Sequence, residues 1–300
     1  MEMRHLRYFV AVVDAGSFSR AAGALDLAQP TLSRQIASLE EEIGTQLLER
    51  APRGVALTEA GKSFVVHARA ITQHAEQAAA EAAGLSRAVR GVAAIGAPHM
   101  FGQAVLGEVA QVYGRKYPDV TLRFVEGLSY LLLEWLEAGR IDLAVLTNMK
   151  LDKRYRSVRM FAEPVHALAP PGHPLLAQRT GPLKLAEVAR HPLIVSTSMN
   201  QGRKILEDMA RKQGIALKVA IEAEDPSTAI ALVRRDLGIA LRPVYSYPRD
   251  PSIESRPVEG LKLDRYLVQR RDIPQRRAVS ELARILLATV QRQYGDRTGR

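Results

Sequence analysis

The stretch AQPTLSRQIASLEEEIG, residues 28–44, combines an apolar stripe and a hydrogen-bonding face on one predicted helix. The apolar residues recur every three or four positions, as on the buried side of a helix, and are Leu32, Ile36, Leu39 and Ile43. A second set recurs at i, i+3, i+4 and i+7 and comprises Thr31, Arg34, Gln35 and Ser38. Pro30 suits the first turn, and Gly44 suits the end. The stretch therefore predicts a helix that is anchored by one side and offers polar groups on another.

The polar side chains of this face are those that recognise DNA. Arginine forms paired hydrogen bonds with guanine, glutamine does so with adenine, and serine or threonine serve either base edges or phosphates. The helix N-terminus adds a favourable dipole toward phosphate. The alternative is an ordinary solvated face, but such faces usually carry Lys and Glu, which are absent from Ala28 to Leu39. The pattern therefore favours a recognition helix.

Residues before this stretch predict the rest of a helix-turn-helix. The apolar residues that give a first helix its buried face are Leu6, Phe9, Val10 and Val13. Gly16 ends that helix, and Ser17 is a favourable N-cap for a second one. The second helix buries Ala21, Ala22 and Leu25. After a short turn the third helix follows, which in this geometry enters the major groove.

A turn-rich hairpin follows the third helix. Residues 47–50 and 55–57 predict two short strands around a turn at 51–54. Arg50 and Arg53 would contact the DNA backbone or the minor groove there, as a wing does. One arginine on a turn is common, so this interpretation depends on the helix-turn-helix that precedes it.

The segment Leu6–Gly61 resembles the winged helix-turn-helix of LysR-type transcriptional regulators. The matching residues are Phe9, Gly16, Ser17, Phe18, Ala21, Ala22, Gln29, Pro30, Leu32, Ser33, Arg34, Gln35, Ile36, Leu39, Glu40, Gly44, Leu47, Leu48, Arg50, Arg53 and Leu57–Gly61. The resemblance places on DNA Gln29, Pro30, Thr31, Ser33, Arg34 and Arg53. The helical pattern adds Gln35 and Ser38, and the wing adds Arg50. With Ser17, the N-cap of the second helix, the predicted DNA-contacting set is Ser17, Gln29, Pro30, Thr31, Ser33, Arg34, Gln35, Ser38, Arg50 and Arg53.

A heptad seam follows the hairpin. The residues that obey the alternating steps of four and three are Phe64, Ala68, Ile71, Ala75, Ala78, Ala82, Leu85 and Val89. A helix over 59–89 would be roughly 45 Å long, and its small residues would allow two copies to approach closely. The segment is also simply rich in alanine, but the large apolar residues keep the period. We therefore expect a linker helix that forms a dimer.

Beyond Gly91, short apolar runs alternate with helical stretches in two successive cycles. This alternation predicts parallel sheets with crossover helices, and separate late strands near 253–258 and 264–269. The resemblance, which extends loosely over nearly the whole chain, implies an α+β fold: an N-terminal winged helix-turn-helix (1–58), a long linker helix (59–89) and a C-terminal two-lobed α/β effector domain (90–300) resembling type 2 periplasmic binding proteins. Lobe I would span about 91–161 and 266–300, and lobe II about 162–265.

The resemblance also implies a small-molecule effector between the lobes, at helix N-termini and strand ends. The residues at those positions are Pro98, His99, Met100, Gly127, Leu128, Ser129, Thr147, Asn148, Ser196, Thr197, Ser198 and Asn200. Hydroxyls and free backbone N–H groups just before a helix near 201–214 would hold a carboxylate, sulfate or phosphate. Ordinary N-capping by Ser198 or Asn200 fits each single residue equally well. The prediction of an anionic effector therefore depends on several such ends converging.

The overall charge does not locate the DNA-binding surface. The formal net charge is +10, but residues 1–90 hold ten basic and ten acidic residues, and the excess lies in 91–300. Solvated surface is the simplest interpretation of that excess, and an anionic ligand is the alternative. Without cysteine there is no disulfide or thiolate metal site, and no apolar run approaches the roughly 18 residues of a membrane helix. We expect a cytoplasmic protein.

Motifs of catalysis are weak. The run AGKS at Ala60–Ser63 lacks the glycine spacing of a phosphate-binding loop. His67 and His74 are seven residues apart, whereas zinc-binding pairs on one helix are four apart. We therefore expect no catalytic residue, no metal site and no cofactor.

These observations predict a sequence-specific transcriptional regulator. Its predicted partners are double-stranded promoter DNA with dyad symmetry, further copies of itself in a homodimer or homotetramer, a small-molecule effector and RNA polymerase, with no membrane. One alternative is an enzyme or solute-binding protein that uses the two-lobed domain, although neither needs a winged helix. An architectural DNA binder is a second alternative, but it would need a basic N-terminal segment.

Overall fold

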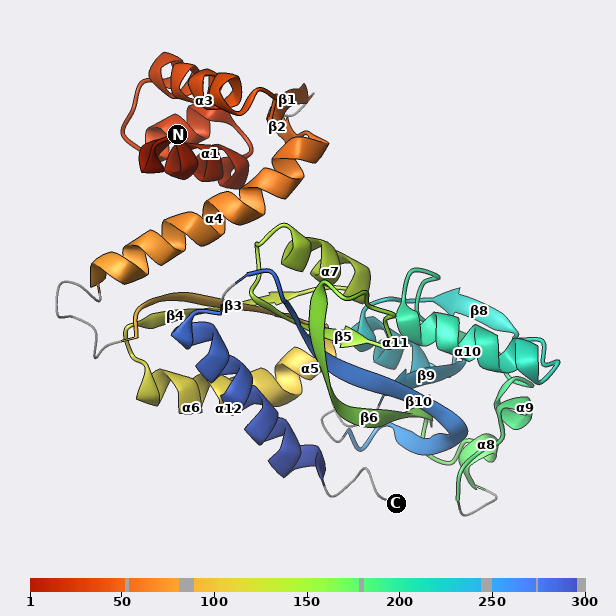
Figure 1. The fold of residues 1–300 in the computed structure, drawn as a ribbon. Helices are drawn as coiled ribbons and strands as arrows, with labels where there is room; N and C mark the ends of the chain where they lie inside the picture. Colours follow the sequence, from red (N-terminus) through yellow and green to blue (C-terminus); the bar gives the residue numbers. More distant parts are fainter. Residues whose placement is uncertain (52–53, 81–88, 178–180, 244–249, 274, 296–300) are drawn as a thin grey trace.

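The computed structural model describes residues 1–51, 54–80, 89–177, 181–243, 250–273 and 275–295. Its N-terminal unit is a three-helix bundle with a two-stranded wing and a long following helix (Figure 1). The elements are α1 (Met3–Ala15), α2 (Phe18–Ala24), α3 (Gln29–Ile43), β1 (Leu48–Ala51), β2 (Gly54–Leu57) and α4 (Glu59–Ala80). The chain turns at Gly16 and Gly44, which adopt the left-handed backbone conformation at the ends of α1 and α3.

The core of this unit follows the predicted stripes closely. Leu32, Ile36 and Leu39 of α3 are buried, and Ile43 is half-buried. In α1 the buried face is shifted slightly, because Val12 fills the core while the predicted Val10 and Val13 are only half-buried.

The predicted seam on α4 divides into two parts. Phe64 and Ala68 pack into the core of their own N-terminal unit, and the ring of Phe64 meets Phe9 edge-on at 5.3 Å between centroids. Further along, Ile71 is 41% exposed and Ala78 is exposed as well. The predicted extension of the helix over 81–88, with Ala82 and Leu85, lies outside the described residues. The exposed part of α4 is thus the part that remains open to a second copy.

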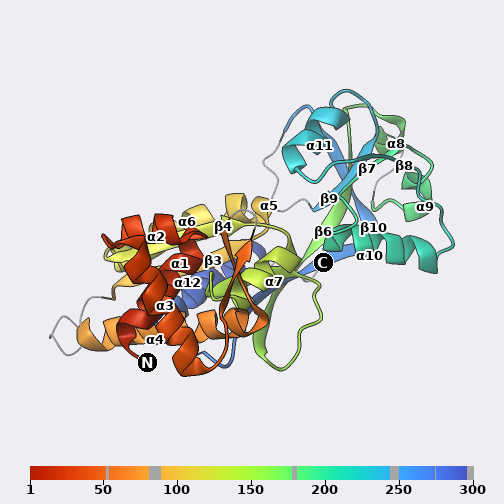
Figure 2. The same ribbon diagram turned by 90° about the horizontal axis from the view of Figure 1, so that it is seen from above.

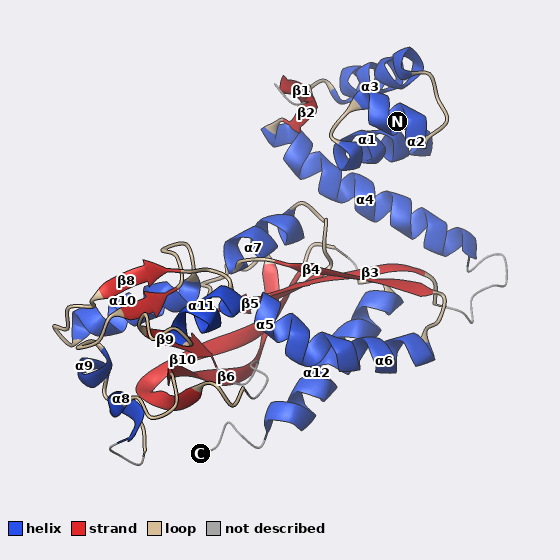
Figure 3. Cartoon of the chain, turned by 180° about the vertical axis from the view of Figure 1, so that it is seen from behind, coloured by secondary structure: helices blue, strands red, loops and turns tan. Residues whose placement is uncertain are grey.

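The rest of the described chain builds one eight-stranded sheet, in the order β4-β3-β5-β10-β6-β9-β7-β8. Its strands are β3 (Gly91–Ala97), β4 (Val120–Glu126), β5 (Leu143–Thr147), β6 (Tyr155–Ala169), β7 (Leu193–Val195), β8 (Val219–Glu222), β9 (Ile239–Pro243) and β10 (Glu254–Arg270). The part around β3, β4 and β5 is called lobe I, and the part around β7, β8 and β9 is called lobe II. Figure 3 shows β6 and β10 running from one lobe into the other.

The strands within each lobe are parallel, but the two that connect the lobes are not. β10 is antiparallel to β5 and to β6, and β6 is antiparallel to β9. The expectation of two separate late strands was wrong, because residues 254–270 form one continuous strand with irregularities in its register. The predicted boundaries between the lobes, at 161/162 and 265/266, lie opposite each other on this strand pair, because Phe161 is paired with Arg265. The register of the pair shifts between Arg265 and Tyr266. A bulge increases local twist and bends a strand.

Each lobe has its own hydrophobic cores on the two faces of the sheet. In lobe I one face is covered by α12 and by the helical segment that contains α6, and the other face by α7. The helices of lobe I are α5 (His99–Phe101), a π-helical segment Gly102–Leu106, α6 (Gly107–Lys116), α7 (Ser129–Glu137) and the C-terminal α12 (Arg277–Tyr294). The helices of lobe II are α8 (Pro174–Ala177), α9 (Leu185–Val188), α10 (Gln201–Lys212) and α11 (Pro226–Val233).

The N-terminal unit lies beside lobe I and away from lobe II (Figure 2). Gly139, just after α7, meets α4 so closely that an added Cβ would lie 3.5 Å from the Cδ of Arg69 and 3.6 Å from the Cα of Val66. Ile273 also packs against the N-terminal core. In the part of the chain that is described, no helix has the combined length and apolar character that crossing a bilayer requires.

Candidate functional site

The recognition helix α3 presents the predicted polar face on the surface. Gln29, Pro30, Ser33, Arg34 and Ser38 are exposed. Thr31 and Gln35 are half-buried. The structure therefore brings together on α3 the residues nominated by the helical pattern and, apart from Arg53, those implied by the resemblance.

The wing is fixed against the first turn of the bundle. The N–H of Val55 donates to the carbonyl oxygen of Gly16 at 3.1 Å. Gly54 has φ +128°, and a Cβ there would lie 2.2 Å from that same oxygen, so this close approach requires glycine. Ser17 is the N-cap residue of α2, although its side chain makes no capping hydrogen bond. The wing thus lies next to Ser17.

The predicted wing arginines are only partly described. Arg50 belongs to β1 and pairs with Val55 across the hairpin, but its side chain lies outside the described part of the structure. Arg53 lies outside the described residues altogether.

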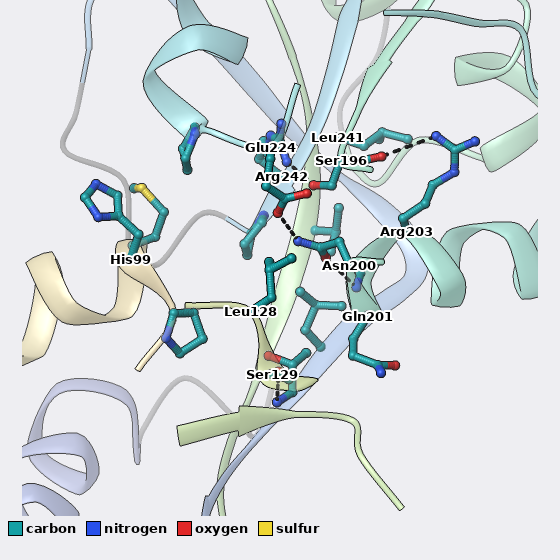
Figure 4. Close-up of a pocket in the computed structure, with 18 of the residues that line it drawn as sticks. His99, Leu128, Ser129, Ser196, Asn200, Gln201, Arg203, Glu224, Leu241 and Arg242 are labelled. Carbon is teal, nitrogen blue, oxygen red and sulfur yellow. Dashed lines mark hydrogen bonds between the residues drawn. The ribbon is translucent and has the colours of Figure 1, made fainter. Parts of the chain in front are cut away.

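A cavity of about 420 Å³ opens between the two lobes (Figure 4). Nine of the twelve predicted effector residues line it: Pro98, His99, Met100, Gly127, Leu128, Ser129, Thr147, Ser196 and Asn200. They come from the start of α5, the start of α7, the end of β5 and the loop before α10. The predicted convergence of helix N-termini and strand ends is therefore present.

The remaining three predicted residues do not line the cavity. Asn148 has φ +45° and exchanges hydrogen bonds with the backbone of Asp264. Ser198 is exposed on a turn. The hydroxyl of Thr197 donates to Glu224 at 2.7 Å, and its backbone N–H donates to the same oxygen at 3.1 Å.

The loop before α10 is therefore not the open anion cradle that the sequence indicates. The carboxylate of Glu224 accepts the N–H of Thr197, and its other oxygen accepts the amide of Asn200. The side-chain oxygen of Asn200 in turn caps α10 by accepting the N–H of Gly202 at 2.8 Å. The protein's own carboxylate thus takes the place expected for a ligand anion, and the capping alternative holds for Asn200.

Arginines form a second polar part of the cavity wall. Arg265 donates twice to Glu163, at 3.0 and 2.7 Å, and also to the hydroxyl of Thr147, so it ties β10 to β6 and β5. Arg242, 5% exposed, donates to the hydroxyl of Ser196 and to the carbonyl oxygen of Ala223. Arg203 pairs with Glu207 and contacts the carbonyl of Ser196.

Acidic side chains from both lobes line the cavity near His99. His99 of lobe I contacts Glu126 of the same lobe. The pKa of Asp225 in lobe II is lowered, chiefly by the hydroxyl of Ser227 and the N–H of Thr228, with a smaller contribution from His99 across the cavity. Lobe I and lobe II are therefore close enough at this edge to influence one another's charges.

Apolar side chains complete the cavity wall. They are Val165, Val195, Leu206, Leu241, Leu261 and Leu263, besides Leu128 and Met100. The hydroxyl of Ser196 accepts from an arginine, and the hydroxyl of Ser129 accepts from the N–H of Thr147. Within the described ranges, no group of three or more His, Asp or Glu side chains could hold a metal ion. The arrangement suits binding of a small amphipathic molecule.

Comparison with known proteins identifies the two parts of the chain. Residues 3–62 match the family described as "Bacterial regulatory helix-turn-helix protein, lysR family", and residues 86–291 match "LysR substrate binding domain". The chain belongs to the LysR family of transcriptional regulators. It is therefore a DNA-binding regulator of transcription with an effector-binding domain, as the sequence predicts.

Individual LysR relatives agree with this assignment. The chain is 36% identical over 248 residues to the regulator BudR of Raoultella terrigena, covering 81% of this chain and 84% of that protein. It is 35% identical over 250 residues to the regulator YnfL of Escherichia coli (strain K12), covering 81% and 82%. These relatives are regulators, and neither is an enzyme or a solute-binding protein by name.

Solved structures of LysR regulators share the whole fold. A full-length OxyR variant from Pseudomonas aeruginosa superposes with a TM-score of 0.77 at 22% identity, covering 97% of this chain and 95% of that one. Full-length CbnR in complex with its target DNA gives a TM-score of 0.64 at 22% identity, covering 98% and 100%. The predicted fold class, a winged helix-turn-helix joined by a helix to a two-lobed domain, is confirmed.

Several residues of the LysR effector cavity were missed by sequence reasoning. Glu224, Arg242 and Arg265 are more than 70 residues beyond Thr147 in the chain, and the two arginines occur in runs without a local binding pattern. Glu224 and the following Asp225 do precede a helix, which is the signal that located the other cavity residues. The arginines lie inside strands, where only the pairing of β6 with β9 and β10 brings them to the cavity.

Proposed function

We propose that this regulator changes its hold on promoter DNA when a small molecule binds between the lobes. The observation that carries the proposal is the position of α7. Leu128 and Ser129 at its start line the cavity, while Gly139 just beyond its end packs on α4. A nine-residue helix is roughly 14 Å long, so α7 spans the distance from the cavity to the turn that contacts α4.

The mechanism is a shift between two arrangements of the lobes. A ligand that contacts both lobes favours the arrangement in which those contacts are made together. Because α7 belongs to lobe I and is followed by Gly139, which packs on α4, a change at the N-terminus of α7 is passed to the linker helix. The spacing of two DNA-binding units, and hence the bend of the DNA between them, then changes.

On DNA we assign the exposed face of α3 to the major groove and the wing to the flanking backbone. The proposed contacts are those predicted from the sequence: Ser17, Gln29, Pro30, Thr31, Ser33, Arg34, Gln35, Ser38, Arg50 and Arg53. The exposed Ile71 on α4 supports a homodimer or homotetramer, for which half-sites with dyad symmetry follow. RNA polymerase is the further partner that we infer, and we place the protein in the cytoplasm with its promoters.

For the effector we propose an apolar body that carries an acidic group. The apolar wall of the cavity suits the body, and Arg242 beside the Ser196 hydroxyl suits the acid. No catalytic step is assigned to these residues. We keep the predicted divisions, with the winged helix at 1–58, the linker helix at 59–89 and the effector domain at 90–300.

The DNA part of the proposal is tested by selecting bound duplexes from a random pool with the full chain. The expected result is an enriched palindromic site, whose half-site spacing reports the dimer. If no sequence is enriched over scrambled competitor at any salt concentration, sequence-specific regulation is wrong.

The effector part is tested by a thermal-shift screen of small carboxylic acids, followed by footprinting on the selected site. The expected result is a ligand that raises the melting temperature and alters the footprint. Leu128→Trp, which fills the cavity, should abolish both effects, while Leu237→Trp, at a position 47% exposed and outside the cavity, should preserve them. A bound ligand that leaves the footprint unchanged contradicts the switch.

A further inference from the structure

A buried histidine holds one side chain of the recognition helix. His5 on α1 is 7% exposed, and its Nε2 lies 3.1 Å from the Oε1 of Gln35 on α3. Gln35 is half-buried, on the same helix face as Thr31, Arg34 and Ser38. The pair therefore connects the interior of the bundle to the surface that we assign to the major groove.

The surroundings of His5 decide which way the Gln35 amide points. With Oε1 facing the ring, Nε2 carries the proton and Nδ1 is an unprotonated acceptor. Nδ1 is buried and has no hydrogen-bond partner among the described residues. If the amide were reversed, Nε2 would accept, and the neutral ring would carry its proton on Nδ1 as a buried donor without a partner. Orphaned buried N–H groups are rarer than unsatisfied acceptors, so the contact from Nε2–H to Oε1 is favoured.

This contact determines what Gln35 still offers to DNA. Glutamine recognises adenine by using its carbonyl oxygen and its amino group together, on N6 and N7. The carbonyl oxygen has a second lone pair, but its contact with the buried imidazole turns it toward the interior of the bundle. The two N–H bonds are therefore the groups that Gln35 can direct at DNA. A group that only donates suits guanine, whose N7 and O6 are both acceptors in the major groove.

We propose that His5 is a positioning residue. It orients the amide of Gln35 so that this side chain offers only hydrogen-bond donors to DNA, and Gln35 therefore selects guanine rather than adenine. The inference rests on the proposed function, in which α3 enters the major groove. It adds a residue that does not touch DNA itself to those that set the sequence preference.

The test is selection of bound duplexes from a random pool by the full chain and by two variants. His5→Leu removes the donor and frees the carbonyl oxygen of Gln35, so adenine should rise at one position of each half-site, with a tenfold or larger change in the guanine-to-adenine ratio. Gln35→Glu keeps the contact with His5 but turns the outward atom into an acceptor. That variant should favour cytosine, which presents the N4 donor.

Arg4→Ala, an exposed neighbour on α1, serves as the matched control and should reproduce the parental profile. Circular dichroism of each full-length variant checks that the bundle is folded, and Gln35→Glu tests the proposal even where His5→Leu destabilises it. Identical profiles for the parent and Gln35→Glu overturn the proposal. A folded His5→Leu variant with the parental profile also overturns it. If the parent itself selects no site, the proposed function fails instead.

Discussion

The recognition surface and the effector cavity are built in opposite ways. Most of the proposed base-reading side chains come from ten consecutive residues, 29–38, of one helix and are largely exposed. The cavity wall comes from segments spread between Pro98 and Arg265, and its charged groups include Arg242 and Arg265, which are 5% and 4% exposed. The exposed polar groups on α3 can therefore change without affecting the fold, whereas polar groups around the cavity also contribute to the packing of the effector domain.

The largest expected effect concerns the buried pair of Glu163 and Arg265. Glu163→Met leaves the Arg265 guanidinium buried without its carboxylate, which should lower the free energy of unfolding by about 3–5 kcal/mol. The measurement is urea unfolding followed by the fluorescence of Trp135, the one tryptophan of the chain, which lies in the effector domain.

A double variant separates the charge from the packing. Glu163→Met combined with Arg265→Met removes both charges and should recover most of the lost stability. If the single variant is as stable as the parent, the polar groups of the cavity wall are as dispensable for folding as those of α3, and the contrast between the two regions fails.

The second prediction concerns the N-terminal unit, where α4 approaches the backbone that precedes the wing so closely that a side chain would not fit. A Cβ on Gly61 would lie 2.0 Å from the carbonyl oxygen of Leu47 and 3.0 Å from the Cδ2 of Leu57. Gly61→Ala should therefore displace the wing from α4 at a cost of about 1–3 kcal/mol and weaken DNA binding. The affinity of the full chain for the selected duplex measures that loss.

Gly23→Ala is the matched control for that change. Gly23 lies in α2, and nothing is within 4 Å of the position its Cβ would occupy. Alanine should therefore be neutral or stabilising there. Equal losses of DNA affinity in the two variants would show that close packing at the wing is unimportant.

The N-terminal region could be predicted from sequence because its interactions are local. The stripe of Leu32, Ile36 and Leu39 and the turn glycines are all within a few residues of the elements they define. The place where this failed is informative: Phe64 and Ala68 fit a dimer seam by period, yet they pack within their own unit. Periodicity identifies a buried face but does not identify its partner.

The cavity could be predicted only in part, for a complementary reason. Helix N-termini and strand ends, such as Leu128 and Thr147, have local signatures, so they were located. Glu224 was not assigned, although it takes the donors expected for a ligand. Arg242 depends on the pairing of β9 with β6 and Arg265 on that of β10 with β6, and interactions between such distant segments leave no periodic pattern. The partners of the charged residues in the cavity wall are therefore set by the tertiary fold and cannot be identified from the local sequence.

The third prediction measures how independent α3 is of the fold. Arg34 is exposed, and its Nε contacts only the carbonyl oxygen of Pro30 at 3.4 Å among the hydrogen bonds of the described residues. Arg34→Ala should lower discrimination between the selected site and a mismatched one by about 1–3 kcal/mol, with no change in urea stability. Competition binding with both duplexes measures it. An unchanged preference with weaker binding to every sequence would assign Arg34 to phosphate.

The smallest expected effect concerns the pH dependence that a buried histidine gives to the effector domain. Burial lowers the pKa of His166 on β6 to about 4, from an ordinary value of 6.5, despite an opposing contribution from Glu163. Between those two pH values the unfolded chain takes up a proton that the folded protein does not, so stability is complete near pH 7 and is lost as the pH falls below 6.5. We expect a loss of about 1–2 kcal/mol between pH 7 and pH 5, measured by urea unfolding with Trp135 fluorescence. His166→Gln, which cannot titrate, should remove that part of the loss. An equal pH dependence in the variant would contradict this prediction and would assign the loss to other groups, among them His191, whose pKa is also lowered by burial.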